Sequence, residues 1–210
     1  MYPKSIQKLM ELFRKLPGIG PRHALRCAFF ALREEGFIPQ LTTALTQVAS
    51  SVTFCAQCFR SMDTQENRIS LCTICRDQKR NHTLIAVVEK EADMQSLEVT
   101  KLFTGTYHVL HGILDPLDAS SPKRLHLREL YTRIMRILEE KKLRDIEVLL
   151  ATNSTAEGDT TARYIEQILK PLGEKYPLLR ISRLGRGLSL GAELEYVDDI
   201  TLQNALTNRR

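Results

Sequence analysis

Four of the five cysteines lie in one short stretch, which constrains the fold more than any other feature of the sequence. They form two Cys-x-x-Cys pairs, Cys55 with Cys58 and Cys72 with Cys75, separated by thirteen residues. In each pair the chain turns back so that two thiolates point at one centre, and the loop allows the second pair to face the first. The spacing predicts one tetrahedral zinc ion per chain, structural because four sulfur ligands leave no coordination position open.

Two disulfides, or two unrelated pairs of thiols, are the alternative interpretations of these cysteines. We expect no secretory signal peptide at residues 1–5, and no apolar run approaches the length that spans a membrane. A cytoplasmic protein is therefore expected, and disulfides are rare in that compartment.

The positive charge is concentrated in the first part of the chain. Residues 1–80 carry 12 Lys and Arg against 6 Asp and Glu, whereas residues 81–210 carry 18 against 19. A basic amino-terminal part is what phosphate binding requires, although an excess this small is explained equally well by a solvated basic face.

Residues 1–54 are predicted to form helices around a hairpin that contains glycine. An amphipathic helix begins near Pro3, a second begins near Pro21, and a third follows. Cys27 lies among apolar helical neighbours and is expected to be a buried thiol. The apolar positions of the three helices are Ile6, Leu9, Met10 and Phe13; Leu25, Ala28, Phe29 and Leu32, predicted to face inward; and Leu41, Ala44, Leu45, Val48 and Val52.

The hairpin between the first two helices has the sequence LPGIGP at residues 16–21. Gly18 and Gly20 permit a tight turn and let backbone N–H groups approach a ligand closely. The amino terminus of the following helix favours an anion such as phosphate, and Arg22 and Arg26 lie on one face of that helix. The pattern predicts a helix-hairpin-helix motif that holds the DNA backbone without reading sequence. A plain turn between helices, with glycine needed only for geometry, is the alternative.

Residues 81–210 alternate between short apolar runs and amphipathic helices. This alternation predicts an α/β domain with a mainly parallel sheet that is flanked by helices on both faces. Strands are expected at 84–88, 107–110, 146–151 and 178–182, with helices near 93–102, 127–138 and 160–169. Ligand sites in such sheets lie beyond the carboxyl ends of the strands.

Acidic residues collect at these strand ends. The layout resembles the Toprim domain of topoisomerases and primases, in which an acid after the first strand and an Asp-x-Asp followed by Glu-Gly hold Mg²⁺ for chemistry on phosphodiesters. Glu89 and Glu157 match the acid positions. Asn153 and Thr155, however, occupy the two Asp positions, and their neutral oxygens are weak partners for Mg²⁺.

The missing Asp pair removes the clamp that metal-assisted displacement needs, so efficient strand cleavage is not expected. Weak Mg²⁺ binding through Glu89, Glu157 and Asp159 stays open. An equally good explanation of Glu157 and Asp159 is charge complementarity at the start of a helix. The Toprim fold can persist as a scaffold after its catalysis is lost.

The hairpin, the cysteine pairs and the degenerate Toprim pattern, in this order, resemble the RecR family of bacterial recombination mediators over nearly the whole chain. In that family Asn and a small residue are usual at the Asp-x-Asp positions. The stretches that carry the resemblance are LPGIGPRHALR (16–26), CAQC…CTIC (55–75), VVEKEAD (87–93), YHVLHGILDPLD (107–118), LLATNSTAEGDTTARYI (149–165) and LGRGLSLGAELEYVDDITLQNAL (184–206).

The resemblance implies a non-enzymatic DNA-binding mediator of recombinational repair, located in the cytoplasm at the nucleoid. Members assemble as homo-oligomers, a dimer or a tetrameric ring, that can encircle DNA. They act with RecO and RecF to load RecA on single-stranded DNA at gaps, independently of the RecBC route. Single-stranded, double-stranded and gapped DNA are the expected ligands.

The resemblance also assigns roles to residues and divides the chain. Gly18, Gly20, Arg22 and Arg26 match the DNA-contacting hairpin, and the acids around Glu157 match a patch that partner proteins contact. The expected parts are residues 1–54 (helix-hairpin-helix), 55–75 (zinc finger), 82–178 (Toprim) and 179–210 (a strand and helix segment). Residues 184–199 match a family motif likened to a nucleotide-binding acidic strand, but no Gly-x-x-x-x-Gly-Lys loop is present and ATP hydrolysis is not expected.

Two other functions compete with this interpretation. One is a Mg²⁺-dependent Toprim enzyme that cleaves or joins nucleic acid, against which stand the missing Asp pair and the lack of a well-placed tyrosine nucleophile. The other is a zinc-stabilised interaction module that never touches DNA, which would be indifferent to the charge of the hairpin.

Overall fold

The computed structural model describes residues 2–64, 70–140, 145–185, 187–188, 191 and 193–207. The chain divides into two compact units, of which the first comprises Met1–Thr53 with Asp63–Gln65 and the second comprises Phe54–Met62 with Glu66–Arg210. The division falls within a small two-stranded sheet of β1 (Val52–Phe54) and β2 (Ser61–Asp63). Among the helices described, none is both long and apolar enough to cross a lipid bilayer.

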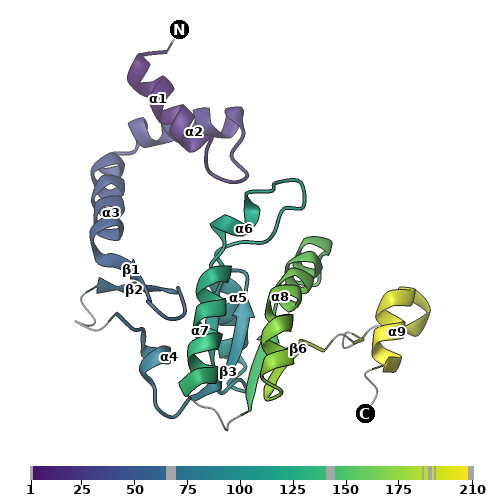
Figure 1. Cartoon of the computed structure of the whole chain (residues 1–210). Helices are drawn as coiled ribbons and strands as arrows, with labels where there is room; N and C mark the ends of the chain where they lie inside the picture. The colour runs from purple at the N-terminus through teal and green to yellow at the C-terminus, as the bar shows by residue number, and fades with distance from the viewer. Residues whose placement is uncertain are drawn as a thin grey trace. The chain divides into compact units, whose positions relative to one another are not determined.

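Three α-helices are described in the first unit, as the sequence predicted: α1 (Lys4–Phe13), α2 (Pro21–Arg33) and α3 (Phe37–Ser51) (Figure 1). Pro21 occupies the first turn of α2, where its fixed φ suits the helix and its missing N–H costs nothing. Helix α2 packs against both α1 and α3. Its buried residues are Ala24, Ala28 and Ala31, a stripe of small side chains that lets the helices approach closely.

The expectations for Leu32, Cys27 and Val52 were wrong, and two further apolar residues of α3 are exposed. Leu32 is 49% exposed because the small residues of α2, and not its leucines, form the buried stripe. Leu45 and Val48 of α3 are also exposed, since the unit has too few elements to cover a second face of that helix. Cys27 is only partly buried, and Val52 lies in β1 instead of the third helix.

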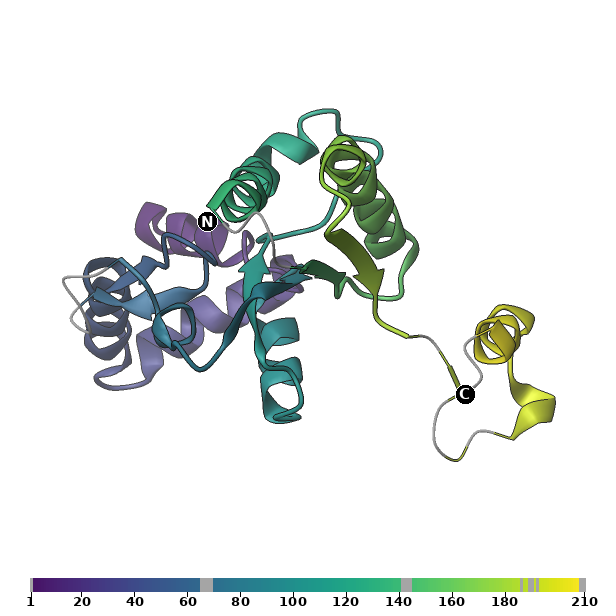
Figure 2. The ribbon, with the colours of Figure 1, turned by 60° about the horizontal axis from the view of Figure 1, so that its bottom comes forward.

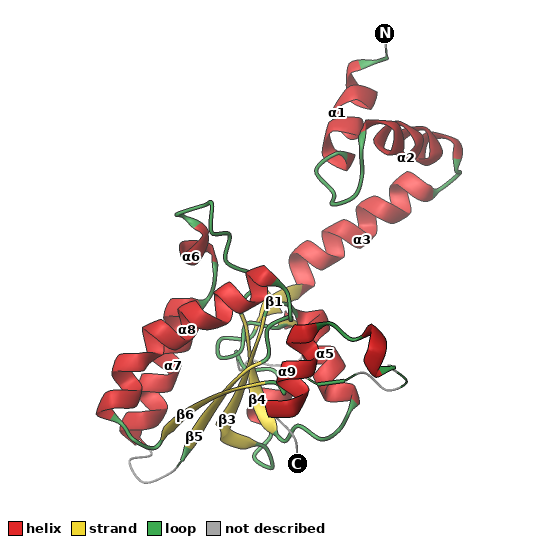
Figure 3. Ribbon diagram, turned by 90° about the vertical axis from the view of Figure 1, so that its right-hand side faces the viewer, coloured by secondary structure: helices red, strands yellow, loops and turns green. Residues whose placement is uncertain are grey.

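The second unit is built on a four-stranded parallel sheet in the order β4-β3-β5-β6 (Figure 3). This confirms the predicted α/β architecture. Its strands are β3 (Asn81–Val88), β4 (Gly105–Val109), β5 (Ile146–Leu150) and β6 (Leu179–Arg183), and its helices are α4 (Thr73–Arg76), α5 (Glu91–Val99), α6 (Ser121–Arg124), α7 (Leu127–Glu140) and α8 (Ala156–Lys175).

The central strand β3 is buried on both faces, which explains its continuous apolar run. Ile85 and Val87 face the layer that α7 and α8 complete, whereas Ala86 and Val88 face a second layer formed with α5 and the four cysteines. Figure 2 shows α7 and α8 on one face of the sheet and α5 on the other. The cysteine segment is therefore part of the same core as the sheet.

Two segments depart from the predicted boundaries. Helix α8 continues through Pro171 to Lys175, because Leu169 and Leu172 on either side of the proline are buried. After β6, the described residues 193–207 form the 3-10 helix η2 (Leu194–Tyr196) and α9 (Asp199–Thr207). The predicted motif at 184–199 lies partly outside the described residues, at positions 186, 189, 190 and 192.

Candidate metal centre and nucleic-acid interface

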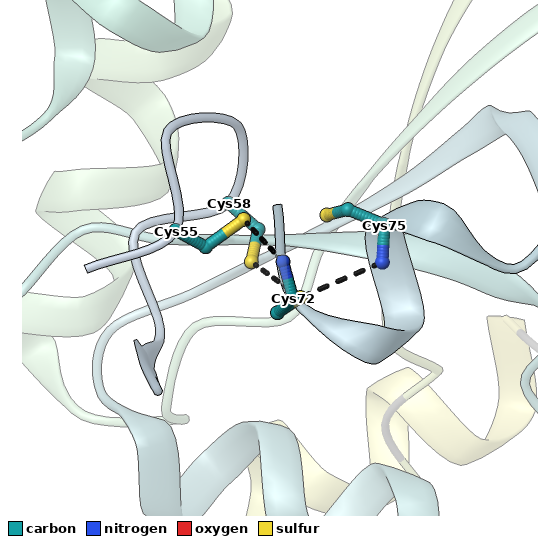
Figure 4. A group of neighbouring side chains, drawn as sticks. All are labelled: Cys55, Cys58, Cys72 and Cys75. Carbon is teal, nitrogen blue, oxygen red and sulfur yellow. Dashed lines mark hydrogen bonds between the residues drawn. The ribbon is translucent and has the colours of Figure 1, made fainter. Parts of the chain in front are cut away.

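The four predicted cysteines come together in one buried cluster (Figure 4). Their Sγ atoms all lie within 4.8 Å of one another, and all four are free thiols. The sulfurs of Cys58 and Cys72 are 3.5 Å apart, well beyond the length of a disulfide bond of about 2.05 Å. A tetrahedral zinc ion with Zn–S bonds of about 2.3 Å separates its sulfurs by about 3.8 Å, so the donor set fits that ion.

Backbone N–H groups donate hydrogen bonds to two of the cysteine sulfurs. The Cys72 N–H donates to the Cys55 sulfur at 3.3 Å, and the Cys75 N–H donates to the Cys72 sulfur, which caps α4. Such donors stabilise thiolates and orient them. Hydrogen bonding from the other thiols, Cys58 first, lowers the pKa of Cys55. Phe59, directly after the first pair, has a φ of +64°. This conformation closes the turn at Cys55–Cys58, which we call the knuckle.

The knuckle at Cys55–Cys58 is bonded to the sheet. The Val109 N–H donates to the Cys58 carbonyl at 2.9 Å, which joins the knuckle to the end of β4. The ring of Phe59 stacks on His126 with centroids 4.0 Å apart, and the His111 ring nitrogen Nε2 lies 2.6 Å from the Phe59 carbonyl oxygen. These contacts tie the cysteine segment to the loops beyond β4.

A buried arginine, Arg133, also contacts the knuckle, and sequence reasoning did not single it out. Its Nη1 donates to the carbonyls of Tyr107 at 2.5 Å and Gln57 at 3.3 Å, and its Nη2 donates to Thr106 Oγ1 at 2.7 Å. Burial lowers the pKa of this guanidinium, while the thiolates of Cys75, Cys58 and Cys55 raise it. The available signal was its position on the apolar face of α7, beside the buried Ile134.

The five histidines form no metal site with the cysteines among the residues described. His108 is fully buried in β4, where its Nε2 lies 2.8 Å from the His126 carbonyl. Desolvation, reinforced by the nearby charge of Arg133, lowers the pKa of His108 to about 3. His108 is therefore a neutral core residue at physiological pH.

The predicted hairpin has an open turn. Gly18 has a φ of +78°, a conformation that side chains other than glycine rarely adopt, and the Ile19 N–H donates to the Leu16 carbonyl. Gly20 is the N-cap of α2 and no side chain caps that helix. A Cβ added at either glycine would meet nothing within 4 Å, so the backbone at the start of α2 is accessible to a ligand.

Arg22 and Arg26 lie in the first two turns of α2, and both are exposed. Among the residues that the structure describes, neither guanidinium has an ion-pair or hydrogen-bond partner. Two unpaired positive charges beside an uncapped helix amino terminus provide a local site for a phosphate group.

The strand-end acids are held by neutral or basic partners. Glu89 is 5% exposed, and its two carboxylate oxygens accept hydrogen bonds from the backbone N–H of Asn153, at 2.8 Å, and from the side-chain amide of the same residue. A Cβ at Gly158 would lie 2.2 Å from the Asn153 carbonyl oxygen and 2.8 Å from Glu89 Oε1. Thr155, at the second of the Asp positions, caps α8 by accepting from the Gly158 N–H.

The structure does not gather the three predicted acids into one metal-binding group. Asp159 lies 3.3 Å from Arg183, which also pairs with Glu166 at 2.7 Å, and Glu157 is exposed in the first turn of α8. Among the described residues, the four cysteines are the one cluster of three or more potential ligands. The Toprim edge is therefore a hydrogen-bonded network around Glu89.

Three family models match separate segments of the chain, and two relatives match it over its full length. Residues 6–49 match the RecR helix-hairpin-helix model, residues 83–181 match the Toprim domain model, and residues 187–210 match the RecR carboxyl-terminal model. Two relatives are each 40% identical to this chain over its full length. They are the recombination protein RecR of Myxococcus xanthus (strain DK1622), covered over 99% of its length, and that of Pelotomaculum thermopropionicum (strain DSM 13744 / JCM 10971 / SI), covered over 97%.

Proposed function

The chain belongs to the RecR family of recombination proteins, and on this premise we propose that it is a non-enzymatic, DNA-binding mediator of recombinational repair. It binds single-stranded, double-stranded and gapped DNA. With RecO and RecF it helps to load RecA on single-stranded DNA at gaps, independently of the RecBC route. The protein acts in the cytoplasm, at the nucleoid.

The hairpin carries this proposal. Gly18 and Gly20 leave the backbone open at the start of α2, and Arg22 and Arg26 have no internal partner among the residues described. Contacts of this kind address the phosphate backbone, so they supply affinity without sequence preference. A mediator that acts at any gap needs this mode of binding.

One structural zinc ion per chain, held by Cys55, Cys58, Cys72 and Cys75, is the second part of the proposal. The sulfur positions and their burial fit such an ion. When bound, the ion crosslinks the two cysteine pairs and supplies folding free energy, but no catalysis. Because the cluster shares a core layer with β3, the metal supports the Toprim sheet as well as the finger.

We infer that the protein is not an enzyme from the partners of the acids at the strand ends. The backbone N–H of Asn153 donates to one oxygen of Glu89 and its side-chain amide donates to the other, while Asp159 lies beside Arg183. These strand-end acids therefore offer no carboxylate pair that would hold Mg²⁺ firmly. Glu89, Glu157 and Asp159 are then a residual acidic patch, of which the exposed Glu157 is suited to contact a basic partner surface. The alternative is a Mg²⁺-dependent Toprim enzyme that uses these acids to cut or join strands.

We propose a homo-oligomer, a dimer or a tetrameric ring, as the active form. One hairpin that contacts only the backbone binds weakly, and several copies around one DNA raise the avidity. The division into residues 1–54, 55–75, 82–178 and 179–210 is part of the same proposal. The last of these segments opens with β6, which pairs with β5.

The test is one incubation of the full chain with labelled gapped DNA and Mg²⁺, divided between a native gel and a denaturing gel. A mobility shift on the native gel with intact strands on the denaturing gel is the expected result. Cut or joined strands would replace the mediator with the Toprim enzyme. An unshifted DNA at low salt would favour an interaction module that does not contact DNA.

A further inference from the structure

Arg133 is a buried positive charge without a carboxylate partner. It is 5% exposed, and its three hydrogen-bond acceptors, on Tyr107, Gln57 and Thr106, are all neutral. Among the residues described, no Asp or Glu forms an ion pair with it. Its Nε has no hydrogen-bond partner within the described part of the chain. Burial of a charged side chain is costly unless an opposite charge lies nearby. Arg133 therefore needs a source of negative charge other than a carboxylate.

The negative charge near Arg133 is that of the cysteines. The thiolates of Cys75, Cys58 and Cys55 favour the charged form of the guanidinium and oppose the effect of its burial, which is to lower the pKa. Four thiolates around one divalent ion carry a net charge of about −2, which is itself buried in this core layer. Arg133 and the thiolates therefore supply each other with a buried charge of opposite sign.

We propose that Arg133 is the counter-charge of the metal–thiolate centre, a positioning residue outside the ligand set that holds the knuckle on the sheet and strengthens metal binding. This inference rests on the zinc site proposed above. The guanidinium reaches the centre through the Gln57 carbonyl, which lies inside the first cysteine pair, and reaches β4 through Thr106 and Tyr107. Metal occupancy is thereby coupled to the contact between α7, β4 and the finger.

Substitutions at position 133 distinguish the effect of the Arg133 charge on zinc affinity from the effect of its packing. A methionine at position 133 fills a similar volume and packs flexibly against apolar neighbours, but it carries no charge. If Arg133 only packed, Arg133→Met would leave zinc affinity unchanged. If its charge offsets the thiolates, Arg133→Met weakens zinc binding, and Arg133→Lys, which keeps the charge but not the planar set of donors, restores most of it.

The experiment measures zinc affinity of the full chain by competition with a chromogenic chelator, together with the zinc content of the purified protein. The variants are Arg133→Met and Arg133→Lys, with Arg136→Met as the matched control, because Arg136 lies one turn further along α7 but is exposed. We expect Arg133→Met to weaken zinc binding by about tenfold or more, the size typical of residues that support metal ligands. The zinc affinity of Arg133→Lys should stay within about threefold of that of the parent. The zinc affinity of Arg136→Met should equal that of the parent.

The outcomes distinguish this inference from the zinc site on which it rests. A parent chain that holds no zinc would overturn the site itself. A parent that holds zinc, with Arg133→Met binding it equally well, would overturn the role of Arg133 alone. Equal weakening by Arg133→Met and Arg133→Lys would show that the hydrogen-bond geometry matters and not the charge. If Arg133→Met does not fold, the comparison of Arg133→Lys with Arg133→Gln decides, since only the lysine keeps the charge.

Discussion

Both carboxylate oxygens of Glu89 accept hydrogen bonds from Asn153, one from its backbone N–H at 2.8 Å and one from its side-chain amide. In the Toprim pattern described above an Asp stands at the position of Asn153, where its carboxylate helps to hold Mg²⁺. Here the backbone N–H and the side-chain amide of Asn153 each direct one N–H dipole at the Glu89 carboxylate, in place of a cation. The hydrogen bonds of the buried carboxylate are thus satisfied within the chain, so the fold at this edge does not depend on a metal ion.

Asn153→Asp tests this relationship. The substitution places a second carboxylate against the buried Glu89 and removes a donor, so we expect a loss of about 2 kcal/mol or more in the free energy of unfolding at neutral pH. Thermal melts with and without Mg²⁺ provide the measurement. Mg²⁺ should raise the Tm of Asn153→Asp, but not that of the parent or of Asn153→Ala. A parent that Mg²⁺ stabilises equally would contradict this account.

Gly158→Ala tests how closely α8 approaches the Glu89 network. The new Cβ would lie 2.2 Å from the backbone carbonyl oxygen of Asn153, which cannot move without breaking the loop, so we expect a loss of about 2–4 kcal/mol in chemical unfolding. Gly173→Ala is the control in the same helix, because its Cβ meets nothing within 4 Å. That variant should be neutral or stabilised by up to about 1 kcal/mol. Equal effects of the two would show that the close contact does not matter.

Cys72→Ser tests the metal centre. The Cys72 sulfur belongs to the four-cysteine cluster and accepts the Cys75 N–H at the start of α4, so its replacement removes one of the four proposed ligands and weakens the metal-coupled folding of this segment. We expect metal analysis to find little zinc, and the melting transition to fall by the equivalent of about 3 kcal/mol or more. Cys27→Ser, a partly buried thiol outside the cluster, should keep its zinc. A zinc-free parent, or a Cys72→Ser variant with parental zinc and Tm, would show that the site is wrong.

His108 makes the stability of the second unit sensitive to acid. Its pKa is about 3 in the folded chain and about 6.5 when unfolded, so between these values only the unfolded state takes up the proton. The contribution of this residue therefore lowers the free energy of unfolding by up to about 1.4 kcal/mol for each pH unit below about 6.5. His108→Gln keeps a donor for the His126 carbonyl and removes this titration.

Urea unfolding of parent and His108→Gln at a series of pH values from about 7 to 4.5 measures this difference. Protonation of the cysteine ligands affects both proteins alike and cancels when the two curves are subtracted. The stability of the parent should fall more steeply than that of the variant. Parallel curves would mean that His108 is protonated in the folded chain.

The alternating pattern predicted most of the fold because buried parallel strands and amphipathic helices have distinct periods. Local patterns of this kind predicted strands β3 (Asn81–Val88) and β5 (Ile146–Leu150) to within a few residues, as well as the clustering of the four cysteines. The burial of individual helix positions in the first unit did not follow. Leu32 and Leu45 are as apolar as a core residue, but the three helices offer no surface to cover them.

Long-range polar contacts could not be predicted from the sequence. The Toprim-like pattern placed Glu89 and Asn153 at the same edge of the sheet, but it did not indicate that the Asn153 amide bonds to Glu89, which lies 64 residues away. Arg133 resembles any other charged residue of α7 until the fold places Gln57 and Tyr107 against it. Such contacts depend on tertiary packing, which periodicity and spacing do not encode.

The most direct test of the central claim is a salt titration of DNA binding by the full chain with both hairpin arginines reversed, Arg22→Glu and Arg26→Glu. The matched control reverses Lys4 and Lys8, which are also four residues apart and exposed, on α1 of the same unit. We expect the arginine pair to weaken binding by about tenfold or more and to reduce the salt slope by about 1.5, with zinc content and fold unchanged. The lysine pair should have a much smaller effect. If the arginine variant binds DNA with the affinity and salt slope of the parent, the hairpin is not the DNA-binding site.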